Sequence, residues 1–267
     1  LDGIDIDWES VDSNNVVNAT QMNNLVKAFK QEMNNRQAKN GTPYLLTAAI
    51  PGTSWGATSS RFDLKTLNSY LDYVNMMSYD VNRTDKTTHL SPAYISSNDG
   101  GYGFGIEYGT TLFTNAGLSK SKIIVGSAGY GKAYKVTGTV SSTSKYPGLG
   151  VSGTITQISG VTGSFASGTL FGNAIDTLLK NSAYVKYIEY NSKGQLVGSF
   201  LFNEYAKRLA DFLKDKKDSK FTNLSKISCN NATSELVAFS FKVSILAKSP
   251  TTVVNAVSTF STSLTVA

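Results

Sequence analysis

The sequence predicts an α/β fold in which a parallel sheet with crossover helices is followed by an inserted antiparallel α+β region. Through Gly126, short apolar runs alternate with segments whose apolar residues recur at helical spacing, the pattern of strands joined by crossover helices. From about residue 134 to 200 the chain is instead rich in Gly, Ser, Thr and Tyr, with short β-like runs. With 40% hydrophobic and only 16% charged residues, the 267-residue chain is able to bury a sizeable core.

The first strand and the first helix are expected at Leu1–Trp8 and Thr20–Asn35. Apolar and acidic residues alternate in Leu1–Trp8, and this period of two is that of a strand with one buried face. In Thr20–Asn35 the apolar residues instead recur every three or four positions from Met22 onward, as they do along the buried face of a helix.

The next strand, Tyr44–Ile50, is an apolar run that ends at Pro51. Phe62–Leu71 is expected to be a short helix, because Asp63 near its start is favourable to the helix dipole. Tyr73–Tyr79 is apolar again and is expected to form the third strand.

A Gly-rich loop then leads to a helix expected at Tyr108–Ala116 and to a fourth strand that starts at Ile123–Gly126. The antiparallel α+β insertion follows. After it, Glu204–Lys217 has the pattern of a helix, and Leu236–Ala247 is a further strand candidate.

Composition excludes several classes of function. The formal net charge of +6 comes without a Lys/Arg stripe, so no nucleic-acid partner is expected. One cysteine, Cys229, and one histidine, His89, exclude thiolate clusters and zinc sites with two or three imidazoles, so no metal is expected. His89 falls in a polar loop and is expected to be solvated. The one Gly-x-Gly-x-x-Gly match, at 148–153, follows Tyr-Pro rather than a strand, so no dinucleotide or other cofactor is expected.

The two ends of the chain carry little information on location. The first residues resemble the middle of a buried strand and show no signal peptide, and Pro250–Ala267 is too rich in Ser and Thr to span a membrane. Asn-x-Ser/Thr sequons such as those at Asn18, Asn82, Asn223 and Asn231 favour a secreted protein only weakly, because the chain is rich in asparagine.

The first strand carries the most informative pattern. Asp5, Asp7 and Glu9 share one face, at steps of about 6.6 Å, with Ile and Trp on the other. If the acids face solvent, the segment is an ordinary amphipathic strand. Two observations count against this: no cation lies on the acidic face, and the apolar face carries Trp8. If the column faces a closed interior, the three acids cannot all ionise without cost, and one that keeps its proton is suited to be a general acid.

The residues around this column also match known motifs. Asp2–Glu9 resembles the DGxDxDxE signature of the family 18 glycoside hydrolases, the chitinases and their relatives. Leu45–Pro51 is similar to the next barrel strand of that family, Met77–Asp80 to its MxYD strand, and Val125–Lys132 to its GxPxYGR strand. The resemblance covers roughly residues 1–217.

This resemblance implies a partial TIM (β/α)8 barrel, about strands 4–8, with an α+β insertion before the last strand. The family motif lies on the fourth barrel strand, so the N-terminal barrel half is expected in the full-length protein. The implied domains are 1–133 for barrel strands 4–7 with their helices, 134–201 for the insertion, 202–248 for a closing helix and strand, and 249–267 for a Ser/Thr-rich tail.

The resemblance also implies a substrate-assisted, retaining hydrolysis of chitin or chito-oligosaccharides by an extracellular enzyme. Glu9 would protonate the glycosidic oxygen, and Asp7 would orient the N-acetyl group of the substrate. Asp5 would hold a proton shared with Asp7. Tyr79 would bond the acetamido oxygen.

Four further residues are implied in substrate binding, and each has a simpler interpretation. Asp80 would bind sugar hydroxyls, or would only cap a turn. Met77 would pack under the sugar ring, and Tyr130 matches a family tyrosine, but in apolar strands both residue types are more often core. Trp55 would stack on a sugar, or would only cover the barrel rim.

Two other functions remain open at this stage. The chain has only Trp8 and Trp55, so the tryptophan that ends the last strand of the family is absent. Together with the missing barrel half, this favours a non-catalytic carbohydrate-binding remnant. An endo-acting glycosidase on N-glycans or peptidoglycan is the third alternative, because related enzymes share the acidic motif.

Overall fold

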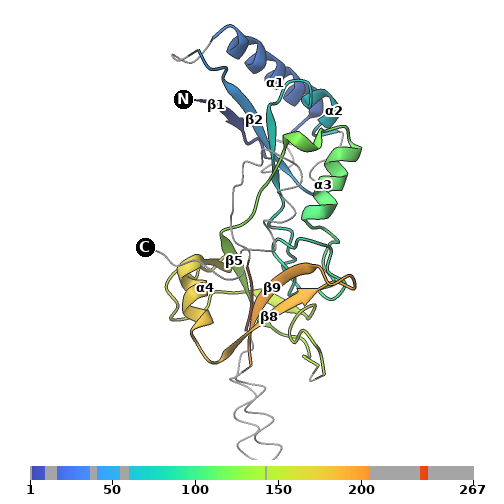
Figure 1. Cartoon of the computed structure of the whole chain (residues 1–267). Helices are drawn as coiled ribbons and strands as arrows, with labels where there is room; N and C mark the ends of the chain where they lie inside the picture. Colours follow the sequence, from blue (N-terminus) through green and yellow to red (C-terminus); the bar gives the residue numbers. More distant parts are fainter. Residues whose placement is uncertain are drawn as a thin grey trace, which may run out of the picture. The chain divides into compact units, whose positions relative to one another are not determined.

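The computed structural model divides the chain into two compact units (Figure 1). It describes residues 2–9, 17–36, 41–54, 60–141, 143–204 and 235–239. The first unit contains the described residues of 1–78 and 106–126, and the second contains those of 79–105 and 127–239. Among the described helices, none combines the length and the apolar character that a membrane span needs.

The first unit is built on a four-stranded parallel sheet in the order β1-β2-β3-β4. Its strands are β1 (Gly3–Ile6), β2 (Leu45–Pro51), β3 (Tyr73–Met77) and β4 (Ile123–Val125). The expected parallel sheet is therefore confirmed, although β1 and β3 are shorter than expected. Asp7 and Glu9 consequently lie just beyond the carboxyl end of β1.

Helices connect these strands: α1 (Ala19–Asn34), α2 (Leu64–Leu67), α3 (Ile106–Asn115) and the 3-10 helix η1 (Lys120–Lys122). Helix α1 begins where the side chain of Asn18 accepts a hydrogen bond from the backbone N–H of Thr20 at 2.9 Å. Asp63 caps α2 by accepting from the backbone N–H of Thr66 at 3.1 Å. These caps satisfy N–H groups that have no partner inside the helix.

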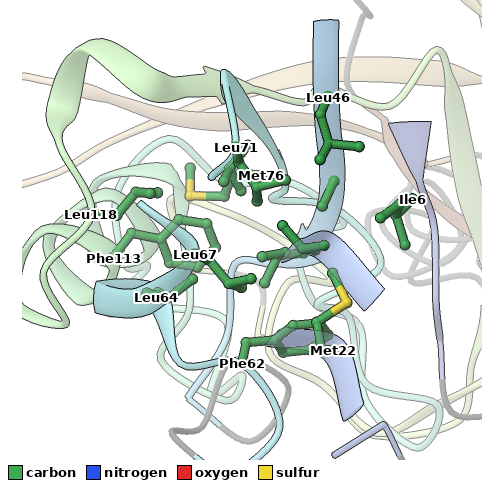
Figure 2. Close-up of a cluster of buried hydrophobic side chains, with 14 of the residues drawn as sticks. Ile6, Met22, Leu46, Phe62, Leu64, Leu67, Leu71, Met76, Phe113 and Leu118 are labelled. Carbon is green, nitrogen blue, oxygen red and sulfur yellow. The ribbon is translucent and has the colours of Figure 1, made fainter. Parts of the chain in front are cut away.

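The core of the first unit lies between one face of the sheet and the helices. Figure 2 shows buried hydrophobic side chains of this core pointing toward one another. The sheet contributes alternate residues of its strands, among them Ile6, Leu46, Ala48, Ile50, Val74 and Met76. The helices and connecting loops contribute Met22, Val26, Phe62, Leu64, Leu67, Phe113 and Leu118. Because strand side chains alternate between faces, the opposite face must carry the intervening residues.

The apolar side of β1 is only partly covered. Ile6 is 8% exposed and Trp8 packs against the core, as expected, but Ile4 is 40% exposed.

The second unit contains a six-stranded antiparallel sheet in the order β6-β5-β10-β9-β8, with β7 paired to β5. Its elements are β5 (Tyr130–Val136), β6 (Gly153–Ile155), β7 (Thr169–Phe171), α4 (Gly172–Leu179), β8 (Tyr184–Tyr190), β9 (Leu196–Asn203) and β10 (Glu235–Phe239). This confirms an antiparallel α+β region after the parallel strands. One cluster of its core packs around Tyr134, Phe200 and Phe202, and another packs around α4.

The two ends of the segment Val125–Lys132 lie in different sheets, contrary to the expectation from the family resemblance. Val125–Lys132 was expected to form one barrel strand, but β4 ends at Val125 and β5 begins at Tyr130, in the other sheet. The candidate strand Leu236–Ala247 is described only at β10, which pairs with β5 and β9. Apart from Glu204, the helix expected at Glu204–Lys217 lies outside the described residues, as does the tail. Within the described ranges the parallel sheet does not close into a barrel.

His89 is not solvated, contrary to the expectation from its polar loop. Its side chain is 3% exposed, and its Nε2 lies 2.6 Å from Oε2 of Glu189, which is itself 1% exposed. The partner lies on β8, a hundred residues further along the chain. The loop sequence alone therefore gives no sign that His89 is covered.

Candidate active site

The acidic face of the first unit begins with Asp5 in β1. Its Oδ1 accepts a hydrogen bond from Oγ1 of Thr47 at 2.5 Å and one from Nδ2 of Asn75 at 2.9 Å. Thr47 lies opposite Asp5 on β2, and Asn75 lies on β3. Three adjacent strands thus converge on one carboxylate, on the face of the sheet that the helices leave uncovered.

Asp7 and Glu9 follow β1 directly in the chain, and both residues are exposed. Active sites of parallel α/β folds lie at the carboxyl ends of the strands, where the loops begin. The neighbouring strand ends are held together there. Gly52 N–H donates to the carbonyl of Met77 at 2.8 Å, and Ser78 Oγ donates to the carbonyl of Gly126 at 2.6 Å.

Met77 closes β3 on the face that also carries Asn75, and it is half-buried. It is absent from the buried core, whereas its neighbour Met76 is fully buried there. The alternation therefore places Met77 on the polar face of the sheet.

Asp80 and Tyr130 form a pair in the second unit. The hydroxyl of Tyr130 donates to Oδ2 of Asp80 at 2.5 Å. Burial raises the pKa of Tyr130 above its ordinary value, and the hydrogen bond to Asp80 raises it further. Tyr130 therefore remains a neutral donor at physiological pH.

The backbone of Asp80 adopts φ +57°, a left-handed conformation. Residues other than Gly, Asn and Asp adopt it only at a cost in conformational energy. Non-glycine residues in this conformation concentrate at functional sites. The preceding Tyr79 is half-buried and packs against the Tyr134 cluster.

The structure thus groups the predicted residues in two sets, one in each unit. Asp5, Asp7, Glu9 and Met77 belong to the first unit, and Tyr79, Asp80 and Tyr130 belong to the second. The eighth predicted residue, Trp55, lies outside the described residues.

Sequence reasoning did not find Thr47 and Asn75. A signal was present, because each is the polar residue of an otherwise apolar strand segment, LLTAAIP and YVNMM. Among the described residues, no group of three or more His, Cys, Asp or Glu side chains is arranged to hold a metal ion.

Comparison with known proteins decides the family. The model of the glycosyl hydrolases family 18 matches residues 1–231, most of the chain. The chain belongs to the glycosyl hydrolases family 18. The resemblance of the acidic motif is therefore confirmed at the level of the family, and the curated relatives of this chain include proteins named chitotriosidase and endochitinase.

Its relatives include chitinases of several kingdoms. Chitotriosidase-1 of Mus musculus is 30% identical over 175 residues, which are 60% of this chain and 36% of that protein. The solved Group IV chitinase of Ostrinia furnacalis has a TM-score of 0.61 at 18% identity and covers 89% of this chain and 55% of that chain. The class V chitinase of Nicotiana tobaccum, solved as a Glu-to-Gln mutant in complex with NAG4, has a TM-score of 0.57 at 20% identity and covers 74% and 53%.

The chain spans about half or less of the length of the curated relatives that it matches. The low identities to solved structures show the fold alone, and together with the family they imply a TIM-barrel-type chitinase fold.

Proposed function

We propose that this chain hydrolyses β-1,4-linked N-acetylglucosamine polymers. The observation that carries the proposal is the acidic face itself. Asp5 is held by Thr47 and Asn75, and Asp7 and Glu9 follow it beyond the carboxyl end of β1. Family membership, and a neighbour solved with NAG4, support this substrate class.

In the proposed reaction, Glu9 donates its proton to the glycosidic oxygen as the bond from that oxygen to the anomeric carbon breaks. The carbonyl oxygen of the substrate's own acetamido group forms the new bond to the anomeric carbon. Water then opens this cyclic intermediate and returns a proton to Glu9, so that the configuration is retained. Asp7 orients the acetamido group and shares a proton with Asp5.

The remaining residues are proposed to bind substrate. Tyr79 bonds the acetamido oxygen, Asp80 binds sugar hydroxyls beside Tyr130, and Met77 packs under a sugar ring. The hydrogen bond between Tyr130 and Asp80 supports these two as a preformed polar pair. We assign Trp55 a stacking role on the resemblance alone.

The architecture that accompanies this function is also a proposal. We assign the parallel sheet to strands 4–7 of a TIM barrel, so that the N-terminal half of the barrel belongs to the full-length protein. An extracellular location is consistent with a polymeric substrate.

The decisive experiment is release of a chromophore from an N-acetylchitobiose glycoside by the purified chain, beside Glu9→Gln. Loss of a general acid lowers the rate by roughly 100-fold or more. Glu107→Gln is the matched control, because Glu107 is an exposed glutamate in the first turn of α3, away from the acidic face. Equal rates for Glu9→Gln and the unmodified chain would contradict the proposal.

The same preparation separates the alternatives. Binding of chito-oligosaccharides without turnover, in a chain that circular dichroism shows to be folded, would favour a non-catalytic binding remnant. This outcome is motivated by the absence of the family's closing tryptophan. Turnover of N-glycans or peptidoglycan in preference to chitin would favour an endo-glycosidase.

A further inference from the structure

Two exposed aromatic side chains in the second unit contact each other. Phe165 is 43% exposed and Phe171 is 53% exposed, and their ring centroids lie 4.8 Å apart at 58°. Neither side chain belongs to the buried clusters of this unit. We call Phe165 and Phe171 the aromatic pair.

A tight turn holds the aromatic pair in place. The backbone N–H of Phe165 donates to the carbonyl of Thr169 at 3.0 Å, and that of Gly168 donates to the carbonyl of Phe165 at 2.8 Å. Gly168 has φ +72°, and a Cβ at this position would lie 2.3 Å from a methyl carbon of Ile155. The turn is therefore packed closely against β6, which limits the entropy that ligand binding would cost.

The aromatic pair continues the surface that carries the Asp80–Tyr130 pair. Phe171 on β7 lies directly opposite Tyr130 on β5. Directly opposed residues on antiparallel strands point to the same face of the sheet, with Cβ atoms about 5 Å apart.

Polar groups border the same face. Lys132 lies opposite Thr169, and its Nζ donates to Oγ1 of Thr169 at 3.0 Å and to the carbonyl of Ser167 at 3.4 Å. The face thus combines exposed aromatic rings with a carboxylate, a phenol hydroxyl, an ammonium and a hydroxyl. A pyranose ring offers matching chemistry, because its axial C–H face is apolar while its rim carries hydroxyl groups.

We propose that the aromatic pair is a sugar-stacking subsite that extends the substrate-binding surface beyond Asp80 and Tyr130. Its occupant is an N-acetylglucosamine ring of the polymer, so the inference rests on the proposed function. The sugar ring stacks on Phe171, and Phe165 fixes the orientation of Phe171 through the tilted contact of the two aromatic rings.

The test measures the affinity of the full chain for the N-acetylglucosamine hexamer by calorimetry, in the Glu9→Gln background to suppress turnover. Phe171→Ala is expected to weaken binding roughly five- to tenfold, the effect of truncating a contact aromatic. Phe171→Tyr, which keeps the ring, is expected to bind as the parent does, and Phe171→Leu, which keeps only apolar bulk, is expected to bind as Phe171→Ala does.

Tyr190→Ala is the matched control, because Tyr190 is a 48% exposed aromatic on β8 of the same sheet. Equal affinities of Phe171→Ala, Tyr190→Ala and the parent would overturn the subsite. Dissociation of an oligomer by Phe171→Ala with unchanged hexamer affinity would also overturn it, because the pair would then be a contact between copies of the chain.

The test of the aromatic pair can fail or succeed independently of the test of hydrolysis. Affinity is measured without turnover, so an inactive chain still tests the aromatic pair. In an active chain with Glu9 intact, Phe171→Ala is expected to raise KM by the same factor with kcat unchanged, as loss of uniform binding does. A fall in kcat at constant KM would overturn the subsite while leaving the role of Glu9 intact.

Discussion

The carboxylate of Glu189 is buried in the second unit, where polar side chains surround it and form hydrogen bonds with it. Asn98 Nδ2 donates to its Oε1 at 2.6 Å, Ser96 Oγ lies 2.9 Å from both carboxylate oxygens, and Nε2 of His89 lies 2.6 Å from Oε2. Burial by itself would raise the pKa of Glu189, but the hydrogen bonds from His89 and Asn98 outweigh it, and the pKa is lowered from 4.5. The charged form is thus favoured by folding.

A pH-dependent contribution to stability follows. Because the pKa of Glu189 is lower in the folded chain, its contribution is complete above about pH 4.5 and is lost as the pH falls through the folded value. Glu189→Gln is expected to reduce the free energy of unfolding at pH 7 by about 2 to 4 kcal/mol. The difference from the parent should shrink below pH 4.5 in urea unfolding. A difference that is constant from pH 7 to pH 3 would contradict this assignment.

The left-handed backbone of Asp80 gives a second prediction for a single residue. Asp80→Ala is expected to destabilise the fold by about 1 to 2 kcal/mol, because alanine is strained at φ +57° and cannot accept from Tyr130. Asp80→Asn should cost less, since asparagine tolerates this conformation and retains an acceptor oxygen. If Asp80→Ala and Asp80→Asn lose the same free energy of unfolding in urea, neither backbone strain nor the hydrogen bond to Tyr130 explains the loss.

At the scale of one element, helix α1 depends on its cap. Asn18 Oδ1 accepts from the backbone N–H groups of Thr20 at 2.9 Å and Gln21 at 3.4 Å. Asn18→Ala should lower the free energy of unfolding by about 1 kcal/mol, and Asn18→Asp should preserve it. The control is Asn24→Ala, an exposed position inside the helix where alanine is neutral or slightly favourable. Equal unfolding midpoints for the two alanine variants would contradict the role of the cap.

Elements were predictable from sequence where their signals are local. Helix α1 has both a cap and a helical period, and its observed bounds differ from those expected by one residue at each end. Helix α2 ends at Leu67, before the expected Leu71, and a contact from a residue distant in sequence accompanies this end. Nζ of Lys122 donates to the carbonyls of Asn68 and Leu71 at 2.7 Å each, and so satisfies carbonyls beyond the helix end.

In the candidate site, too, residues close in sequence were predictable and those brought together by the fold were not. Asp5, Asp7 and Glu9 were found because they lie within a few residues of one another. Thr47 and Asn75, the partners of Asp5, are 42 and 70 residues away, and only the pairing of three strands brings them together. The aromatic pair was missed because Phe171 acquires its position by pairing with Tyr130 across the second sheet.

At the scale of the whole chain, each unit has its own core, and among the described residues the buried cluster of the first unit shares no residue with the two clusters of the second. The first unit packs Ile50 fully buried beneath its helices, and the second packs Ile175 of α4 at 1% exposure. Local unfolding follows such cooperative units, so the stability of one core can be changed without changing the other.

A matched pair of substitutions tests this independence. Ile50→Val and Ile175→Val each delete one buried methyl group, at a cost of about 0.5 to 1.5 kcal/mol. By hydrogen exchange with mass spectrometry, Ile50→Val should reduce protection in β2 and β3 by roughly two- to tenfold and leave β5 and β9 unchanged, because 1.4 kcal/mol corresponds to a factor of about ten. Ile175→Val should do the reverse. If either variant lowers protection equally in both sheets, the two units unfold as one cooperative body, and the separate cores do not define separate units of stability.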